Sequence, residues 1–237
     1  AAETLKRITL ELGGNDAGIV LDDANPKEVA SKIFAGAFVN SGQVCIALKR
    51  LYVHEKIYDA LCDELAEIAK NTIVDDGMKQ GTQMGPLQNK KQFEKAKAYL
   101  VDARISGRVI AGGEIVNRPG YFVLPTIVRD IKDGAKLVDE EQFAPILPVI
   151  KFSDQNDAVS RANASPYGLG ASVWSPNPER AYEVASRLEA GTVWINKHFD
   201  IGPNIPFAGA KQSGLGVEFA EEGLAEYTQM KVVNIAR

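Results

Sequence analysis

The sequence contains few of the residues that build disulfide scaffolds and metal sites. Its 237 residues include two cysteines, Cys45 and Cys62, and two histidines, His54 and His198. Two cysteines cannot cross-link a chain of this length, so we expect a packed core and a reduced, cytoplasmic environment. Neither histidine is expected to belong to a ligand set at metal-binding spacing, and we predict no metal site.

Long apolar runs and an excess of one charge are also missing. Gly, Pro or a charged residue interrupts each apolar stretch before it reaches the roughly 20 residues that a membrane helix needs. Lys and Arg number 27 against 31 Asp and Glu, with no basic stripe for a phosphate backbone. We therefore expect neither a membrane nor a nucleic acid as partner. The chain starts without Met or a signal-peptide core, so we expect it to continue a longer protein.

What the sequence does contain is helical spacing alternating with short β-rich runs. Asn25 before Pro26 and Asn177 before Pro178 each predict a capped helix start, and apolar spacing predicts another helix over 58–69. The predicted strands are Ile8–Leu12, Gly18–Leu21, Arg50–Val53, Ile146–Phe152, Gly170–Trp174 and Thr192–Asn196. This order predicts an α/β fold with an open, largely parallel twisted sheet flanked by helices.

A glycine turn that leads to a cysteine follows the first predicted helix. The turn at Gly42 can present the Cys45 thiol away from the packed face, where backbone amides can stabilise a thiolate. The alternative is a small buried apolar residue, the commoner state of a free cysteine. Cys62 lies on the apolar face of a helix and is expected in the core.

An acidic residue ends an otherwise apolar strand near the start of the chain. Glu11 is followed by Leu12 and two glycines, Gly13 and Gly14. A carboxylate there is costly to bury without a partner or a chemical role. The alternative is a polar strand end that is already in solvent.

The two segments together resemble the paired signatures of the aldehyde dehydrogenase superfamily. Glu-Leu-Gly-Gly at 11–14 and Gly-Gln-Val-Cys at 42–45 place Glu11 and Cys45 at the family's spacing, and similar blocks at 141–145, 167–169, 194–196 and 206–214 follow in the family's order. The resemblance implies an NAD- or NADP-dependent enzyme that oxidises an aldehyde. It implies Cys45 as nucleophile and Glu11 as general base.

The resemblance also implies roles for weaker candidates. Glu141 and Phe143 would contact the nicotinamide riboside, with Leu12 and Gly13 beside it, and Glu218 would relay protons toward the base. For Glu141 a solvated acidic turn remains open, and for Glu218 an ordinary surface position. The residues that would line the substrate pocket are Val44, Ile46, Ile201 and Phe207. They favour an apolar or modest-sized aldehyde over a charged one, and Phe207 could equally be core.

A division of the chain follows from the same resemblance. Residues 1–14 would end a cofactor-binding domain, 15–205 form the catalytic domain, 206–223 return toward the cofactor domain, and 224–237 form an oligomerisation strand at Tyr227–Ile235. The intact protein would then be a homodimer or homotetramer. The 237 residues alone would turn over little. Two alternatives are a coenzyme A-acylating enzyme, disfavoured by the presence of Glu11, and a non-catalytic assembly module.

Overall fold

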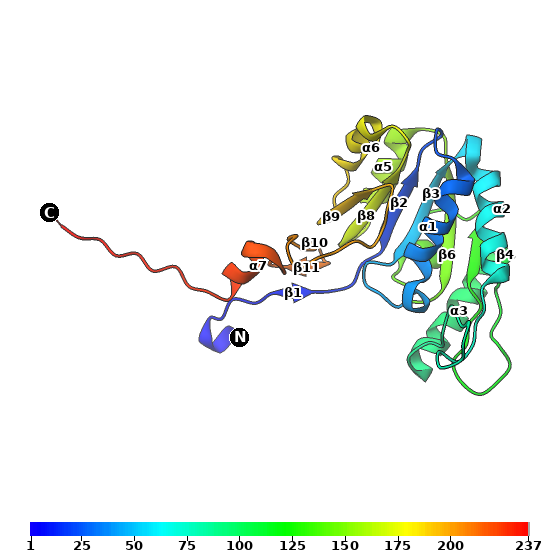
Figure 1. Cartoon of the computed structure of the whole chain (residues 1–237), viewed down its shortest axis with the longest axis horizontal. Helices are drawn as coiled ribbons and strands as arrows, with labels where there is room; N and C mark the ends of the chain where they lie inside the picture. The colour runs from blue at the N-terminus through cyan, green and yellow to red at the C-terminus, as the bar shows by residue number, and fades with distance from the viewer. Residues whose placement is uncertain (237) are drawn as a thin grey trace.

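A seven-stranded sheet forms the centre of the computed structural model, which describes residues 1–236. Its strands are β2 (Asp16–Val20), β3 (Leu48–His54), β4 (Arg108–Ala111), β5 (Thr126–Arg129), β6 (Ile146–Phe152), β8 (Gly170–Trp174) and β9 (Thr192–Ile195). They lie in the order β4-β5-β6-β3-β2-β8-β9, and only the pair β4–β5 is antiparallel (Figure 1). The predicted open, largely parallel sheet is confirmed.

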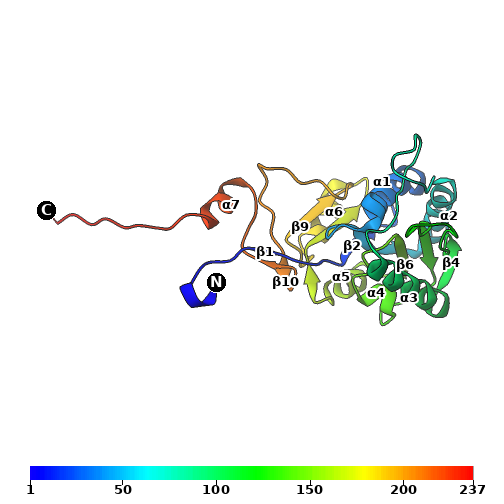
Figure 2. The same ribbon diagram turned by 90° about the horizontal axis from the view of Figure 1, so that it is seen from below.

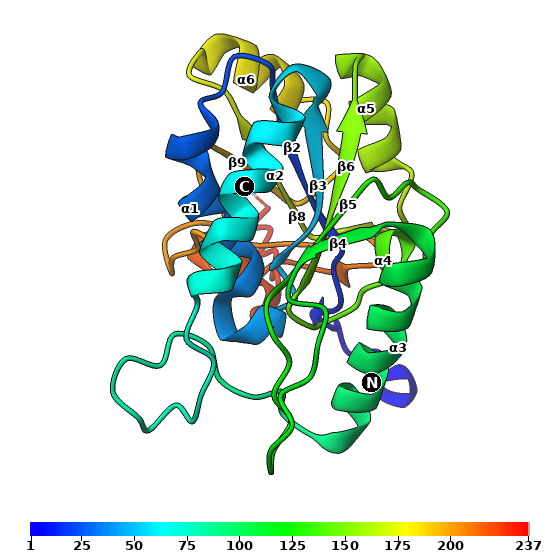
Figure 3. The same ribbon diagram turned by 90° about the vertical axis from the view of Figure 1, so that its right-hand side faces the viewer.

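Helices cover both faces of this sheet (Figure 3). On one face lie α1 (Pro26–Phe38) and α2 (Glu55–Asn71), and on the other α3 (Lys90–Ser106), α4 (Lys136–Asp139), α5 (Gln155–Asn163) and α6 (Pro178–Ala185). Strand side chains alternate, so Leu51 packs with α1 and α2 while Tyr52 packs on the opposite face. Cys62 is fully buried in the α1–α2 layer, as predicted. No helix within residues 1–236 is long and apolar enough to cross a bilayer.

Two helix starts follow the predicted capping chemistry. The Asn25 side chain accepts a hydrogen bond from the N–H of Lys27 at 3.2 Å, ahead of Pro26. The Asn177 side chain accepts from the N–H groups of Glu179 and Arg180, both at 3.1 Å. These side chains satisfy N–H groups that have no partner inside the helix, which fixes where α1 and α6 begin.

Both ends of the chain leave the sheet and lie side by side as an arm as far as α7, beyond which the C-terminal segment extends alone (Figures 1 and 2). The arm and its attachment contain a one-turn 3₁₀ helix η1 (Ala2–Thr4), β1 (Leu10–Glu11), β7 (Tyr167–Gly168), β10 (Ala210–Lys211), β11 (Gly214–Leu215) and α7 (Ala220–Glu226). β1 pairs antiparallel with β11, and β10 pairs antiparallel with β7. The predicted strand Ile8–Leu12 is therefore shorter than expected and lies outside the main sheet.

The predicted terminal strand at Tyr227–Ile235 has no pairing partner within the described residues, so its role as an oligomerisation strand stays a prediction. Residues 228–236 form neither helix nor strand, and Val232 and Val233 are each 71% exposed. A strand requires a hydrogen-bonded neighbour, and no other part of residues 1–236 runs beside this segment (Figures 1 and 2).

Candidate active site

The predicted site residues gather where the parallel strands begin. Gly14 precedes β2, Cys45 precedes β3 and Phe143 precedes β6, each by no more than three residues. Because these strands run parallel, their starts share one edge of the sheet. β1, which contains Glu11, leads directly into the same edge. Segments far apart in the sequence are thereby brought to one place.

A left-handed turn carries the chain from α1 to Cys45. Asn40, Ser41 and Gly42 have φ values of 49°, 59° and 72°, within the short 3₁₀ helix η2 (Val39–Gly42). A Cβ on Gly42 would lie 2.5 Å from the carbonyl oxygen of Ala144, so this position requires glycine for space as well as for conformation. The turn leaves Cys45 only half-buried, unlike the fully buried Cys62.

Lys49 lies beneath residues 44–47, here called the cysteine turn. Its Nζ donates to the carbonyl oxygens of Val44, Cys45 and Ala47 at 2.7, 2.8 and 3.2 Å. The carbonyl groups of the turn are thus directed toward the interior. The backbone N–H of Cys45 has no acceptor within residues 1–236 and is available to a ligand.

His198 supports the same turn as a neutral ring. Its Nε2 lies 2.9 Å from the carbonyl oxygen of Ile46 and must donate, because a carbonyl only accepts. Its Nδ1 then accepts from the hydroxyl of Ser172 at 3.0 Å, and that hydroxyl accepts from Nε1 of Trp174 at 3.0 Å. Burial lowers the pKa of His198 to about 4, which agrees with a neutral imidazole.

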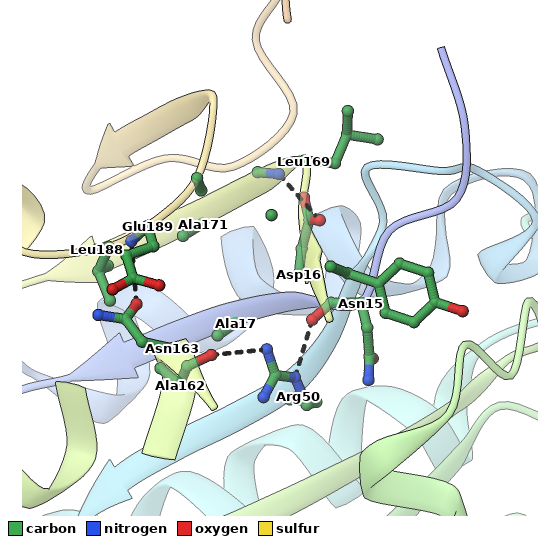
Figure 4. Close-up of a pocket in the computed structure, with 14 residues that line it drawn as sticks. Asn15, Asp16, Ala17, Arg50, Ala162, Asn163, Leu169, Ala171, Leu188 and Glu189 are labelled. Atoms are coloured by element: carbon green, nitrogen blue, oxygen red, sulfur yellow. Dashed lines mark hydrogen bonds between the residues drawn. The ribbon is translucent and has the colours of Figure 1, made fainter. Parts of the chain in front are cut away.

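Asp16 is a second buried titratable group at this edge. Its Oδ1 accepts from the N–H of Gly170 at 3.1 Å, and its Oδ2 lies 3.7 Å from His198 Nε2. Burial raises the pKa of Asp16 to about 7. Figure 4 shows Asp16 near Arg50, whose guanidinium donates to the carbonyl oxygens of Asn15 and Ala162 at 2.8 and 3.1 Å.

Glu11 faces the Cys45 thiol from β1. Burial and then the hydrogen bonding and charge of Glu11 raise the pKa of Cys45 to about 12, against the opposing effects of the Ile46 N–H and the Lys49 charge. The thiol is therefore protonated at neutral pH, with a carboxylate beside it. Glu11 itself is exposed to solvent within the described residues.

Glu141 is held against the glycine pair rather than left in a solvated turn. Its Oε1 accepts from the N–H of Gly14 at 3.0 Å, and a Cβ on Gly13 would lie 2.5 Å from its Oε2. Phe143 follows with a positive φ of 51°, its ring centre 5.8 Å from Lys49 Nζ. The structure therefore brings Gly13, Glu141 and Phe143 together beside the cysteine turn.

The substrate-pocket candidates divide into two groups. A small cluster of buried apolar side chains consists of Ile46, Leu169, Trp194 and Phe207. Val44 and Cys45 pack against it, so Val44, Ile46 and Phe207 adjoin the thiol. Ile201 is 42% exposed and lies outside this cluster.

Two further candidates are fixed through their backbones. Glu218 exchanges both backbone hydrogen bonds with Phe207, at 2.7 and 2.8 Å, and its residue is half-buried. The N–H of Leu12 donates to the carbonyl oxygen of Ser213 at 3.0 Å, and its side chain is largely exposed.

No cluster of three or more His, Cys, Asp or Glu side chains suited to a metal occurs within residues 1–236.

Sequence analysis assigned no role in this region to Asp16 or Lys49, and of His198 it predicted only that the residue does not belong to a metal site. A usable signal existed for the first two. Lys49 stands in the apolar run of β3 and Asp16 starts the buried β2, and a charge in such a run needs a partner or a chemical role. His198 carries no comparable signal, because it follows β9 in an irregular segment.

Comparison with known proteins gives one consistent family. The model of the aldehyde dehydrogenase family matches residues 1–233. A mitochondrial aldehyde dehydrogenase of Leishmania tarentolae is 41% identical over all of this chain and 48% of its own length. Phenylacetaldehyde dehydrogenase of Pseudomonas fluorescens is 42% identical, over 98% of this chain and 47% of its own.

Solved structures agree with these relatives. An NAD+ complex of aldehyde dehydrogenase from Bacillus cereus superposes with a TM-score of 0.95 at 42% identity, covering 99% of this chain and 48% of that one. The chain spans about half the length of the relatives it matches. With the family's motifs gathered at one edge of the family's sheet, the chain belongs to the aldehyde dehydrogenase family.

Proposed function

We propose that the protein oxidises an aldehyde to a carboxylic acid, with NAD or NADP as acceptor and Cys45 as nucleophile. The observation that carries the proposal is that the fold brings Glu11 and Cys45, whose backbone N–H has no acceptor within residues 1–236, to the same edge of the sheet. Family membership and the NAD+ complex of the Bacillus cereus enzyme support the reaction class and the cofactor.

The first half of the reaction uses the contacts around the thiol. Glu11 takes the proton of Cys45, and the sulfur forms a bond to the aldehyde carbon. The aldehyde oxygen becomes an oxyanion that accepts from the backbone N–H of Cys45. A bound nicotinamide would supply the acceptor for the hydride of this carbon, and loss of that hydride would leave a thioester on Cys45.

The second half regenerates the thiol. Glu11, exposed at the mouth of the site, accepts a proton from water as the water attacks the thioester carbon. The carbon–sulfur bond breaks, the carboxylic acid leaves, and the Cys45 sulfur recovers a proton. Glu218 would pass the released protons toward solvent. The presence of Glu11 favours hydrolysis over transfer of the acyl group to coenzyme A.

The residues around Glu141 fit a nicotinamide nucleoside. Gly13 approaches the Glu141 carboxylate closely, since a Cβ at this position would lie 2.5 Å from Oε2, and the N–H of Gly14 fixes one oxygen of the carboxylate. Glu141 would bind the ribose hydroxyls, Phe143 would pack near the ring, and Leu12 and Gly13 would border the same position. Val44, Ile46, Ile201 and Phe207 would line the aldehyde pocket.

The test compares aldehydes and cofactors in the full-length protein. A panel of aliphatic and aromatic aldehydes is assayed with NAD and with NADP, beside Cys45→Ser and Glu11→Gln variants. We expect acid formation without coenzyme A, its loss in Cys45→Ser, and a hydrolysis step slowed at least about 100-fold in Glu11→Gln. Full activity in Cys45→Ser, or activity only with coenzyme A, would refute the proposal.

The 237 residues by themselves are expected to turn over little, since relatives of this family are about twice as long. Cofactor-dependent turnover by the isolated chain at the rate of a full-length relative would contradict this. A chain that binds neither aldehyde nor cofactor in any context would favour the assembly module instead. We expect the full-length protein to form a homodimer or homotetramer.

A further inference from the structure

The charge state of Lys49 follows from its surroundings. The residue is 2% exposed, and its Nζ lies 2.7, 2.8 and 3.2 Å from three carbonyl oxygens. Carbonyl oxygens only accept hydrogen bonds, so three of them around one nitrogen require three N–H groups. An ammonium has three and a neutral amine has two. The geometry therefore indicates a buried positive charge.

This charge is surrounded by acids without forming a close ion pair. No carboxylate oxygen within residues 1–236 lies within 4.0 Å of Lys49 Nζ. Burial lowers the pKa of Lys49, whereas neighbouring acids raise it. The charged and titratable groups that face this region are Glu11 from β1, Asp16 from β2, Cys45 from the cysteine turn, Arg50 from β3, Glu141 from the loop before β6, and His198 after β9.

We propose that Lys49 is a positioning residue for the reaction above, orienting the cysteine turn through three carbonyl groups and stabilising the Cys45 thiolate through its charge. The proposal rests on Cys45 being the nucleophile. The hydrogen bonds turn the carbonyl groups inward, which leaves the Cys45 N–H free for the oxyanion. The ammonium offsets burial and Glu11, which both favour the protonated thiol.

The experiment measures the rate of Cys45 alkylation by iodoacetamide against pH, on the 237-residue chain, without aldehyde or cofactor. Peptide mapping separates Cys45 from the buried Cys62. Lys49→Gln keeps amide donors for the carbonyl groups and removes the charge, whereas Lys49→Arg keeps the charge. Lys70→Gln, at an exposed position near the end of α2, is the matched control.

Because the pKa of Cys45 lies near 12, the variants are compared below the inflection of the profile. We expect Lys49→Gln to be alkylated about tenfold more slowly than the parent chain at each pH between about 7 and 10, which corresponds to a rise of about one unit in the pKa of Cys45. Lys49→Arg and Lys70→Gln should react at the rate of the parent chain. An unchanged rate in Lys49→Gln would overturn the proposal. So would failure of Lys49→Gln to fold, because the side chain would then serve stability alone. Loss of turnover in Cys45→Ser tests the nucleophile separately.

Discussion

Asp16 and His198 respond to pH in opposite directions although they lie 3.7 Å apart. The carboxyl group of Asp16 keeps its proton up to about pH 7 in the folded chain, against a reference value of 3.8. Between these values the folded state binds more protons, so this group lowers stability as pH rises. His198, with its pKa lowered from 6.5 to about 4, raises stability as pH rises through that range. The two contributions offset each other.

Replacing Asp16 with Asn removes the contribution of Asp16 to the pH dependence of stability and leaves that of His198. The measured quantity is the free energy of unfolding of the parent chain minus the free energy of unfolding of Asp16→Asn. This difference should fall as pH rises from about 4 to about 7. We expect a fall of about 3–4 kcal/mol, measured by urea unfolding at several pH values. Asp63→Asn, on the exposed side of α2, is the control and should show a constant difference. A constant difference for Asp16→Asn as well would mean that its proton is not retained on folding.

The two glycines after Glu11 are expected to differ in their tolerance of a methyl group. A Cβ on Gly14 would lie 2.6 Å from the backbone oxygen of Cys45, which cannot move without shifting the cysteine turn. A Cβ on Gly13 meets only the end of the flexible Glu141 side chain. Gly14→Ala should cost about 1–3 kcal/mol and slow Cys45 alkylation, whereas Gly13→Ala should cost under about 0.5 kcal/mol.

Urea unfolding and the alkylation rate measure both glycine variants. Gly77→Ala, where a Cβ has open space, is the control. Equal stability of Gly14→Ala and Gly13→Ala would contradict the close packing of the cysteine turn on the glycine pair.

The site was predictable only as far as its motifs extend. Glu11 and Cys45 were proposed through the pairing of their motifs, and the glycine turn was predicted through Gly42. Lys49 and Asp16 depend on contacts with segments distant in the fold, which local sequence does not contain. The edge of the sheet was also not predictable: ligands in open α/β sheets usually bind at the carboxyl ends of strands, whereas this site lies at the amino ends.

At the level of elements, predictability followed the strength of the apolar pattern. β6 and β8 have the predicted bounds, because each is a short apolar run buried on both faces of the sheet. α3 was not predicted, since two of its four buried residues are alanines and its apolar stripe is weak. β4 and β5, of four residues each, are too short to show a period.

The cap of α6 is the element-level contact that sequence described best, and it can be tested alone. Asn177→Ala removes the acceptor of two backbone N–H groups at the start of the helix. We expect a loss of about 1 kcal/mol in the free energy of unfolding. Asn234→Ala, at an exposed position in the terminal segment, should change it by less than about 0.5 kcal/mol. Equal effects would mean that the helix start does not depend on this cap.

For the whole molecule, the arm is the part that the sheet does not stabilise. β1 and β11 pair only with each other, away from the main sheet (Figure 1). The exposed apolar side chains of the arm include Ile8, Leu10, Leu12, Leu215, Phe219 and Leu224. Soluble monomers seldom expose apolar side chains in such number on one feature, and such surfaces are typical of interfaces. We expect the arm to be covered by further protein, consistent with an oligomer of the full-length protein.

Deletion from residue 229 onward tests whether the last segment joins copies of the chain. Residues 229–236 make no backbone hydrogen bond with the rest of the described chain, so their loss should change the free energy of unfolding by less than about 0.5 kcal/mol. An extended segment with exposed Val232, Val233 and Ile235 can instead add to the sheet of a second copy.

Sedimentation velocity over a range of concentrations should show weaker self-association after deletion, and also in a Val232→Asp, Val233→Asp variant. Asn234→Ala leaves the apolar side chains in place and should associate like the parent. Unchanged self-association after deletion would place any contact between copies elsewhere on the arm.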